Sequence, residues 1–295
     1  MRYPPIPKTA LVTGCSSGIG LAAATMLQAR GWRVLATARK ARDLEMLIAN
    51  GFEAIEIDMS DSESVRDAGE AALTLTDGQL GAVVNNAGFG QPGAFEDLTR
   101  EALREQFEVN VFGLQQLTRQ FIPSMCERGS GRIVMVSSVV GNVALPFLGA
   151  YSASKFALEA LSDSLRVEMV GTGVAVSIMQ PGPIITAFRH HTMDKIESDD
   201  TLQTSRFRGF YKREMERKRT RVKTPGFINK PPEAVGIKIV HALESARPWR
   251  RYCISPSAYA GAWIRRLFPF AVVDALLTKR VLRTLELNAD LRSEG

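Results

Sequence analysis

The chain carries Thr13-Gly14-Cys15-Ser16-Ser17-Gly18-Ile19-Gly20 between an apolar run at residues 10–13 and a helical pattern at residues 19–30. Glycine has no Cβ, so the backbone of such a turn can approach a phosphate group closely. The free N–H groups at the start of the following helix, together with its dipole, favour an anion there. A strand, a glycine-rich turn and a helix in this order predict a dinucleotide-binding unit, although the spacing is GxxxGxG rather than GxGxxG.

Short apolar runs alternate with longer helical patterns along most of the chain. We expect strands at residues 10–13, 34–37, 54–57, 82–84, 133–136 and 174–179, and helices at residues 19–30, 62–75, 100–127 and 151–170. Strand–helix–strand repeats pair their strands in parallel through right-handed crossovers, with helices on both faces. The sequence therefore predicts an α/β fold with a doubly wound, mostly parallel sheet of the Rossmann type, whose ligands bind beyond the carboxyl ends of the strands.

Composition limits the class of protein. A hydrophobic content of 45% in 295 residues fits one globular domain, expected at residues 8–255, with a C-terminal amphipathic extension at residues 256–295. Cys15, Cys126 and Cys253 are scattered without CxxC spacing, so we expect neither disulfides nor a metal site, and the three histidines suggest no metal either. This cysteine pattern and the absence of a secretory signal favour the cytoplasm.

The positive charge of the chain is concentrated in one segment. The net charge is +6, and residues 187–231 hold twelve Lys and Arg against six Asp and Glu, an excess of six that equals the total. A local basic segment is typical of a solvated face or a flap. We therefore expect no nucleic-acid partner.

The end of the second expected strand predicts which cofactor the chain prefers. An acidic residue there would bind a free ribose 2′-hydroxyl, whereas arginine suits a 2′-phosphate. The chain has Arg39 followed by Lys40, and a guanidinium can bind a phosphate with two parallel hydrogen bonds. This favours NADP(H), with an ordinary solvated basic pair as the alternative. Ser16, Lys40 and Arg42 are the next candidates for a phosphate ligand.

The next two strand exits offer polar residues for the rest of a dinucleotide. Asp58 is suited to accept the adenine amino group, and the small side chains of Asn86, Ala87 and Gly88 could lie against a ribose. Either set could instead cap a loop.

Three residues beyond the later strands suggest proton-transfer chemistry. Tyr151 and Lys155 are four apart in an expected helix and so share a face. The pKa of an unperturbed tyrosine is about 10. A lysine ammonium and a positive nicotinamide ring nearby would lower it. Ser138, at the end of a strand, can donate a hydrogen bond to a substrate oxygen on which negative charge develops.

Taken together, these motifs resemble the classical short-chain dehydrogenase/reductase family from about Thr9 to Thr186. They appear in order as TGxxxGIG at residues 13–20, NNAG at residues 85–88, Asn110, Ser138, the pair Tyr151 and Lys155, and PGxxxT at residues 181–186. The glycine turn and Arg39 are most similar to the branch that holds 17β-hydroxysteroid and retinol dehydrogenases and bacterial NADPH-aldehyde reductases.

The resemblance implies a role for each matching residue. Tyr151 would be the general acid in reduction and the base in oxidation, Lys155 would bind the nicotinamide ribose, and Ser138 would orient the carbonyl. Asn110 would hold a water that links Lys155 to solvent. The cofactor-binding set would comprise Gly14, Ser16, Ser17, Gly18, Ile19, Gly20, Arg39, Asp58, Asn86, Ala87, Gly88, Tyr151, Lys155, Pro181, Gly182, Ile184 and Thr186.

Beyond Thr186 the resemblance ends, and two segments remain. Residues 187–231 mix aromatic and charged residues, as a lid that closes over a lipophilic substrate would, with a helix expected at residues 207–221. Residues 259–277 are apolar, aromatic and basic, but too interrupted to span a bilayer. They could pack on the body, on a second subunit or on a membrane surface.

These expectations describe an enzyme that transfers hydride between NADP(H) and a lipophilic alcohol or carbonyl, working as a homodimer or homotetramer. Two alternatives remain. A nucleotide-sensing regulator would keep the fold without turnover, but it would lack part of the Tyr–Lys–Ser set, which is complete here. A basic scaffold on a membrane surface would depend on the tail.

Overall fold

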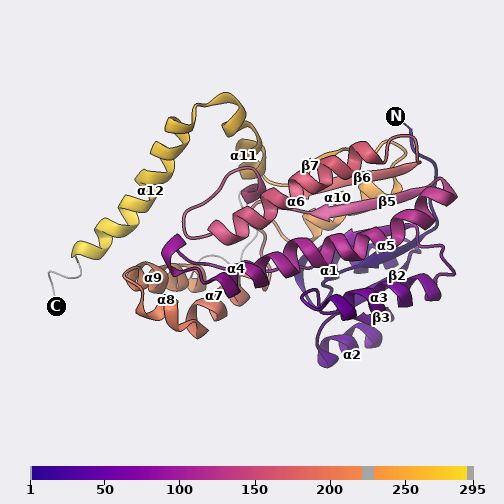
Figure 1. Ribbon diagram of the computed structural model, residues 1–295, viewed down its shortest axis with the longest axis horizontal. Coiled ribbons are helices and arrows are strands. Elements are labelled where there is room, and N and C mark those ends of the chain that lie inside the picture. The colour runs from indigo at the N-terminus through magenta and orange to yellow at the C-terminus, as the bar shows by residue number, and fades with distance from the viewer. Residues whose placement is uncertain (1, 221–228, 291–295) are drawn as a thin grey trace.

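The computed structural model describes residues 2–220 and 229–290. Its strands are β1 (Thr9–Val12), β2 (Arg33–Ala38), β3 (Glu53–Glu56), β4 (Ala82–Asn85), β5 (Gly131–Val136), β6 (Val174–Gln180) and β7 (Arg251–Cys253). They form one sheet in the order β3-β2-β1-β4-β5-β6-β7, with every neighbouring pair parallel (Figure 1). The doubly wound fold is confirmed, and the strand order reverses between β1 and β4, where such folds bind ligands.

Helices cover both faces of the sheet. One face carries α1 (Gly18–Gln28), α2 (Ala41–Ala49) and α10 (Glu233–Glu244), and the other carries α3 (Ser62–Leu75), α5 (Gly113–Arg128) and α6 (Gly149–Glu168). Successive strand residues point to opposite faces, so Val134 and Val136 enter the first core while Ile133 and Met135 enter the second. Strands buried on both sides explain the continuous apolar runs in the sequence.

Residues 100–127 do not form the single helix that their periodicity predicts. The chain forms α4 (Arg100–Phe107), a π-helical turn (Glu108–Phe112) and then α5. Gly113 packs so tightly that a Cβ on it would lie 2.2 Å from the carbonyl oxygen of Met59. One extra residue in a turn barely disturbs apolar spacing, so the pattern could not reveal it. Such turns are frequent at functional sites, and this one contains Asn110.

The sequence pattern also misses α2, α10 and β7. Strand β7 has only three residues and gains its backbone hydrogen bonds at the edge of the sheet beside β6. Helix α10 packs on α1, where Gly236 faces Met26 so closely that a Cβ would lie 2.7 Å from its sulfur. These elements depend on tertiary contacts more than on local sequence preference.

Three helices occupy the described part of the segment expected as a lid. They are α7 (Phe188–Ser198), α8 (Asp200–Thr204) and α9 (Arg208–Thr220), and they gather beyond the carboxyl ends of the strands (Figure 1). The helix expected at residues 207–221 corresponds to α9, and the residues from 221 to 228 lie outside the described part.

A buried polar cluster attaches this helical segment to the body. The Ser205 hydroxyl donates to Asp97 Oδ2 at 2.7 Å, and the Tyr211 hydroxyl donates to the same oxygen. The Tyr211 hydroxyl in turn accepts a hydrogen bond from the Ala94 backbone N–H at 2.8 Å. The segment from Ser205 to Tyr211 is therefore fixed to the residues that follow β4, while closure over a substrate stays a prediction.

The tail forms two more helices, α11 (Pro256–Leu267) and α12 (Phe270–Asp290). Ser255 begins α11 by accepting a hydrogen bond from the Ala258 N–H at 3.3 Å, and Pro256 suits the first helical turn. In Figure 1, α12 runs outward from α11. Within residues 2–220 and 229–290, no helix combines the length and apolar character needed to cross a bilayer.

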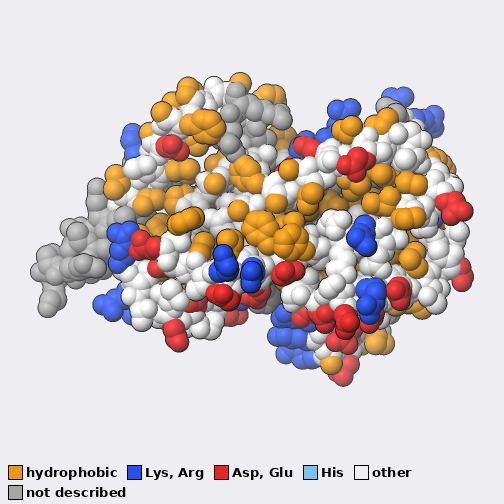
Figure 2. Space-filling view, viewed as in Figure 1, with side chains coloured by type: hydrophobic (Ala, Val, Ile, Leu, Met, Phe, Trp, Pro, Cys, Tyr) orange, Lys and Arg blue, Asp and Glu red, His pale blue; other side chains and the backbone are white. Residues whose placement is uncertain are grey.

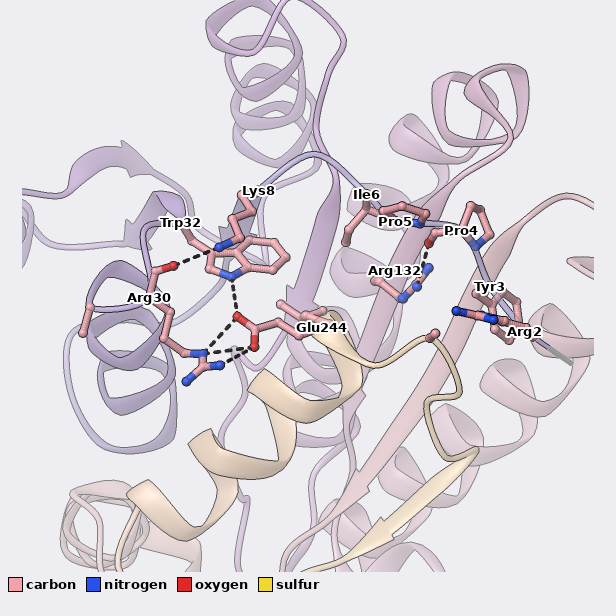
Figure 3. Close-up of a pocket in the computed structure, with 13 residues that line it drawn as sticks. Arg2, Tyr3, Pro4, Pro5, Ile6, Lys8, Arg30, Trp32, Arg132 and Glu244 are labelled. Carbon is pink, nitrogen blue, oxygen red and sulfur yellow. Dashed lines mark hydrogen bonds and ion pairs between the residues drawn. The ribbon is translucent and has the colours of Figure 1, made fainter.

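A cleft of about 700 Å³ lies at the amino-terminal edge of the sheet (Figure 3). Nη2 of the buried Arg132 donates a hydrogen bond to the carbonyl oxygen of Pro4 at 2.9 Å. Glu244, at the end of α10, accepts hydrogen bonds from Arg30 and Trp32. These contacts attach the N-terminal segment and the ends of α1 and α10 to the edge remote from the strand exits, so we assign this cleft a structural role.

Candidate active site

The glycine turn after β1 forms one end of a cavity of about 400 Å³ at the strand exits. Gly14 and Gly18 have φ angles of 72° and 62°, which side chains rarely tolerate. Ser17 precedes α1 in an extended conformation, and its side chain does not cap the helix. The N–H groups of the first turn of α1 are thus left for a ligand, as a pyrophosphate would require.

Close packing explains why this turn needs its third glycine. A Cβ on Gly20 would lie 2.2 Å from the carbonyl oxygen of Gly14. Gly20 therefore supports the turn from behind, while the other predicted residues of the turn line the cavity directly: Gly14, Ser16, Ser17, Gly18 and Ile19.

The segment after β4 closes one wall of the same cavity. Asn86 Nδ2 donates to the carbonyl oxygens of Thr13 and Gly14, at 2.9 and 3.2 Å, and so fixes the glycine turn. Asn86, Ala87 and Gly88 all line the cavity. A Cβ on Gly88 would lie 2.9 Å from Asn110 Oδ1 and 3.7 Å from Lys155 Nζ, so only glycine leaves this approach open.

Ser138, Tyr151 and Lys155 meet in the cavity, as the sequence predicts. Tyr151 and Lys155 come from the first turns of α6, and Lys155 Nζ lies 5.9 Å from the centre of the Tyr151 ring. The Lys155 ammonium also donates to the carbonyl oxygen of Val136 at 2.9 Å, which holds the side chain against the end of β5. Ser138 lies two residues beyond that strand, and its hydroxyl is close enough to Tyr151 to act on the pKa of the tyrosine.

Burial shifts the pKa values of both groups. It raises the pKa of Tyr151 to about 12, against the hydrogen bond from Ser138, which lowers it. It lowers the pKa of Lys155 to about 8, against the charge of Glu159, which raises it. The shift of Tyr151 is opposite to the lowering expected from the sequence, which also invoked a positive nicotinamide ring. Without that ring, the site holds a protonated phenol, the form that can donate a proton.

Asn110 lies behind Tyr151 and Lys155 rather than on the cavity surface. Its Nδ2 donates to Phe89 O at 3.0 Å and to Ser154 Oγ at 3.1 Å, and its Oδ1 accepts from Phe89 N at 3.1 Å. The side chain thereby joins the π-helical turn, the loop after β4 and α6. Its structural contribution is positioning, and its role in holding a water for Lys155 remains a prediction.

The segment after β6 completes the cofactor end of the cavity. Pro181, Gly182, Ile184 and Thr186 all line it. A Cβ on Gly18 would lie 3.0 Å from Thr186 Cγ2, so two motifs that are far apart in the sequence are neighbours here.

Arg39 and Asp58 lie outside this cavity, at the exits of β2 and β3. Arg39 Nη1 is 3.6 Å from Asp58 Oδ2, and both side chains are partly open to solvent. Burial acts to raise the pKa of Asp58, but hydrogen bonds from Ser60 and the charge of Arg39 hold it below its usual value. An incoming 2′-phosphate would therefore share Arg39 with Asp58, an ion pair that the sequence does not predict.

The opposite end of the cavity is apolar, and the sequence motifs miss most of it. Tyr151 faces Phe188 with ring centres 5.4 Å apart, above Gly90, where a Cβ would lie 2.9 Å from the Phe188 ring. The further lining residues outside the motifs are Val136, Ser137, Val139, Val140, Leu145 and Pro183. Only the aromatic content of residues 187–231 signalled this wall, because the other residues belong to loops without a pattern.

Known proteins and a family model match the sequence of this chain. A family model described as short chain dehydrogenase matches residues 8–197. The uncharacterized oxidoreductase YbbO of Escherichia coli (strain K12) is 40% identical over 92% of this chain and 94% of its own. Retinol dehydrogenase 8 of Homo sapiens is 32% identical over 82% of this chain and 79% of its own.

Solved structures agree with these relatives. A short-chain dehydrogenase from Burkholderia cenocepacia J2315 in complex with NADP is 26% identical, with a TM-score of 0.70 over 94% of this chain and 99% of that one. A relative from Burkholderia phymatum in complex with NAD is also 26% identical, with a TM-score of 0.73 over 88% of this chain and 93% of that one. The chain belongs to the short-chain dehydrogenase family, and it is an oxidoreductase of that family built for a nicotinamide cofactor.

Proposed function

We propose that this enzyme uses NADP(H) to interconvert a lipophilic aldehyde or ketone and its alcohol. One observation carries the proposal. The protonated Tyr151 phenol and its partner Ser138 lie between a glycine turn suited to a pyrophosphate and a wall of apolar side chains. A carbonyl placed there has a proton donor, a hydrogen-bond donor and no charged side chain among the residues of that wall.

The reaction needs one hydride and one proton for each carbonyl reduced. The bound cofactor would supply the hydride to the carbonyl carbon. Tyr151 would donate its hydroxyl proton to the carbonyl oxygen and become a phenolate, while Ser138 donates a hydrogen bond to the same oxygen. Lys155, as an ammonium, would stabilise that phenolate and hold ribose hydroxyls until a solvent proton restores the phenol. Alcohol oxidation would run through the same steps in reverse.

The apolar wall supports a lipophilic substrate. Phe188, Leu145, Val139 and Val140 offer no partner for a carboxylate or a phosphate on the substrate. A relative in the same family is a retinol dehydrogenase, whose name refers to a lipophilic alcohol. A steroid, a retinoid and a long-chain aldehyde all fit this chemistry.

Cell location and assembly are part of the proposal too. Cys15, Cys126 and Cys253 are free thiols, which suits a reducing cytoplasm. Exposed apolar side chains on or near α6, including Leu161, Val167 and Val170, support a homodimer or homotetramer. No part of the proposal involves nucleic acid.

Purified enzyme with NADPH is expected to reduce a long-chain aldehyde, a ketosteroid or all-trans-retinal. The reaction is measured as the decrease in NADPH absorbance. A short keto acid serves as the control, because its carboxylate would lie against the apolar wall without a partner. Reduction of the keto acid alone would contradict the proposed substrate class.

Arg39→Asp is expected to lower the ratio of kcat/KM for NADPH over NADH by one to two decades. Charge-assisted hydrogen bonds to a phosphate are worth roughly 1.5–3 kcal/mol, and the new carboxylate beside Asp58 would repel the 2′-phosphate. The ratio is measured with one carbonyl substrate at fixed ionic strength. Arg247→Asp, at an exposed position beyond α10, makes the same charge change and should leave the ratio unaltered.

Two results would count against this assignment. A wild-type enzyme that already favours NADH would contradict it before any substitution is made. An unchanged ratio in Arg39→Asp would move the phosphate to Ser16, Lys40 or Arg42.

A further inference from the structure

We propose that α11 and the first half of α12 form a contact face that seats this enzyme on an anionic phospholipid surface, without crossing it. The face stands on its own evidence, and only its connection to substrate supply rests on the proposed function. We call this surface the tail face and define it by Tyr259, Trp263, Leu267, Phe268 and Leu276.

One side of helix α11 packs on the body of the protein, and the other side is exposed to solvent. Ala258 is fully buried, and a Cβ on Gly261 would lie 2.6 Å from Val139 Cγ2, so this side rests directly on the loop after Ser138. On the other side, Tyr259, Trp263 and Leu267 follow one another at intervals of four and share one stripe. Their exposed fractions are 53%, 54% and 66%.

The same apolar surface continues around the corner into α12. Phe268 and Phe270 flank Pro269 at the corner, and both are exposed, as is Leu276 in α12. Val273 is buried, and α12 contacts α9. Figure 2 shows hydrophobic side chains gathered over the upper left of the molecule, where α11 and the start of α12 lie. Soluble surfaces rarely expose so many large apolar side chains together, so a partner is expected.

Charge and residue type favour a bilayer over a second protein. Residues 256–282 contain four basic residues, Arg265, Arg266, Lys279 and Arg280, against one acidic residue, Asp274. The core of a protein interface is usually depleted of charge, whereas aromatic and apolar residues next to arginine and lysine are typical of helices that lie in an anionic membrane interface. Tyrosine and tryptophan are also enriched at the level of lipid headgroups.

The tail face lies next to the substrate cavity. Val139 lines the cavity on one side and meets Gly261 of α11 on the other. Gly182, also in the cavity wall, is so close to Ser255 at the start of α11 that a Cβ would lie 2.0 Å from the Ser255 oxygen. One helix thus separates the proposed lipid surface from the catalytic residues, and a substrate dissolved in the bilayer would have a short path to them.

Flotation of the full-length enzyme with vesicles tests this proposal. Wild-type enzyme is expected to float with vesicles of phosphatidylcholine and phosphatidylglycerol, less with phosphatidylcholine alone, and less again at high salt. The double variant Trp263→Glu with Leu267→Glu should lower the vesicle-bound fraction at least about tenfold, because it adds two charges to the bare stripe.

Matched controls separate the outcomes. Ile48→Glu with Ile237→Glu adds the same charge at exposed apolar positions on α2 and α10, and should float like wild type. Circular dichroism checks that each variant is folded, and turnover of a water-soluble aldehyde should stay at the wild-type level in both. If wild-type enzyme does not turn over that aldehyde, the result counts against the proposed function, but not against the tail face.

Two outcomes overturn the proposal. Wild-type enzyme that fails to float with anionic vesicles has no lipid-binding face. Unchanged flotation of the tail variant, with its assembly reduced in analytical ultracentrifugation, would assign the face to a second copy of the chain.

Discussion

Tyr151→Phe is expected to lower the turnover of carbonyl reduction by at least about 100-fold, the usual cost of losing a general acid, while NADPH still binds. The change removes the hydroxyl proposed to transfer the proton, yet it keeps the ring that packs against Phe188. The measurements are kcat with a lipophilic aldehyde and the Kd for NADPH by fluorescence titration.

The control for this variant is Tyr3→Phe, which removes a hydroxyl at the opposite edge of the sheet and should keep full turnover. Undiminished turnover in Tyr151→Phe would show that the proton comes from elsewhere. A loss of NADPH binding along with turnover would show instead that the hydroxyl positions the cofactor.

Lys155→Met is expected to lower both turnover and cofactor affinity, the latter by roughly 10- to 100-fold if charge-assisted bonds to ribose of about 1.5–3 kcal/mol are lost. It should also change the pH profile of alcohol oxidation, which requires the Tyr151 phenolate. An ammonium nearby favours the phenolate, so its removal raises the pKa of Tyr151 and moves the rise of the oxidation rate with pH to higher pH.

The pKa of Lys155 itself adds a second signature. Because burial lowers it to about 8, the free wild-type enzyme loses this ammonium, and its support of the phenolate, above that pH. Lys155→Arg keeps a charge at all these pH values and serves as the comparison. Melting temperatures check that losing the bond to the Val136 carbonyl has not unfolded the variant. A pH profile that does not move in Lys155→Met would mean that this lysine does not tune the tyrosine.

Much of the fold could be predicted because its strands are buried on both sides. Val134 and Val136 pack in one core and Ile133 and Met135 in the other, which leaves a continuous apolar run, as expected of a central strand. The π-helical turn around Asn110 could not be predicted, since it depends on contacts with Phe89 and Ser154, distant in sequence.

The candidate site divides in the same way. The cofactor end is built from glycines and polar residues at fixed spacing, so the resemblance to the family implies that Gly14, Gly18 and Thr186 serve one cofactor, and they do lie together. The substrate end is built from loops and from α7, where side chains such as Leu145 and Phe188 meet through tertiary packing alone. The upward shift in the pKa of Tyr151 also depends on burial, which spacing does not reveal.

The most direct test of the account is hydride transfer itself. NADPH labelled with deuterium at C4, on one face and then on the other, is incubated with the enzyme and a lipophilic aldehyde, and the alcohol is analysed by mass spectrometry. The account predicts one deuterium on the carbinol carbon from only one of the two labelled cofactors, and almost no labelled alcohol with Tyr151→Phe. Alcohol formed without deuterium from either cofactor, or labelled equally well by Tyr151→Phe, would contradict it.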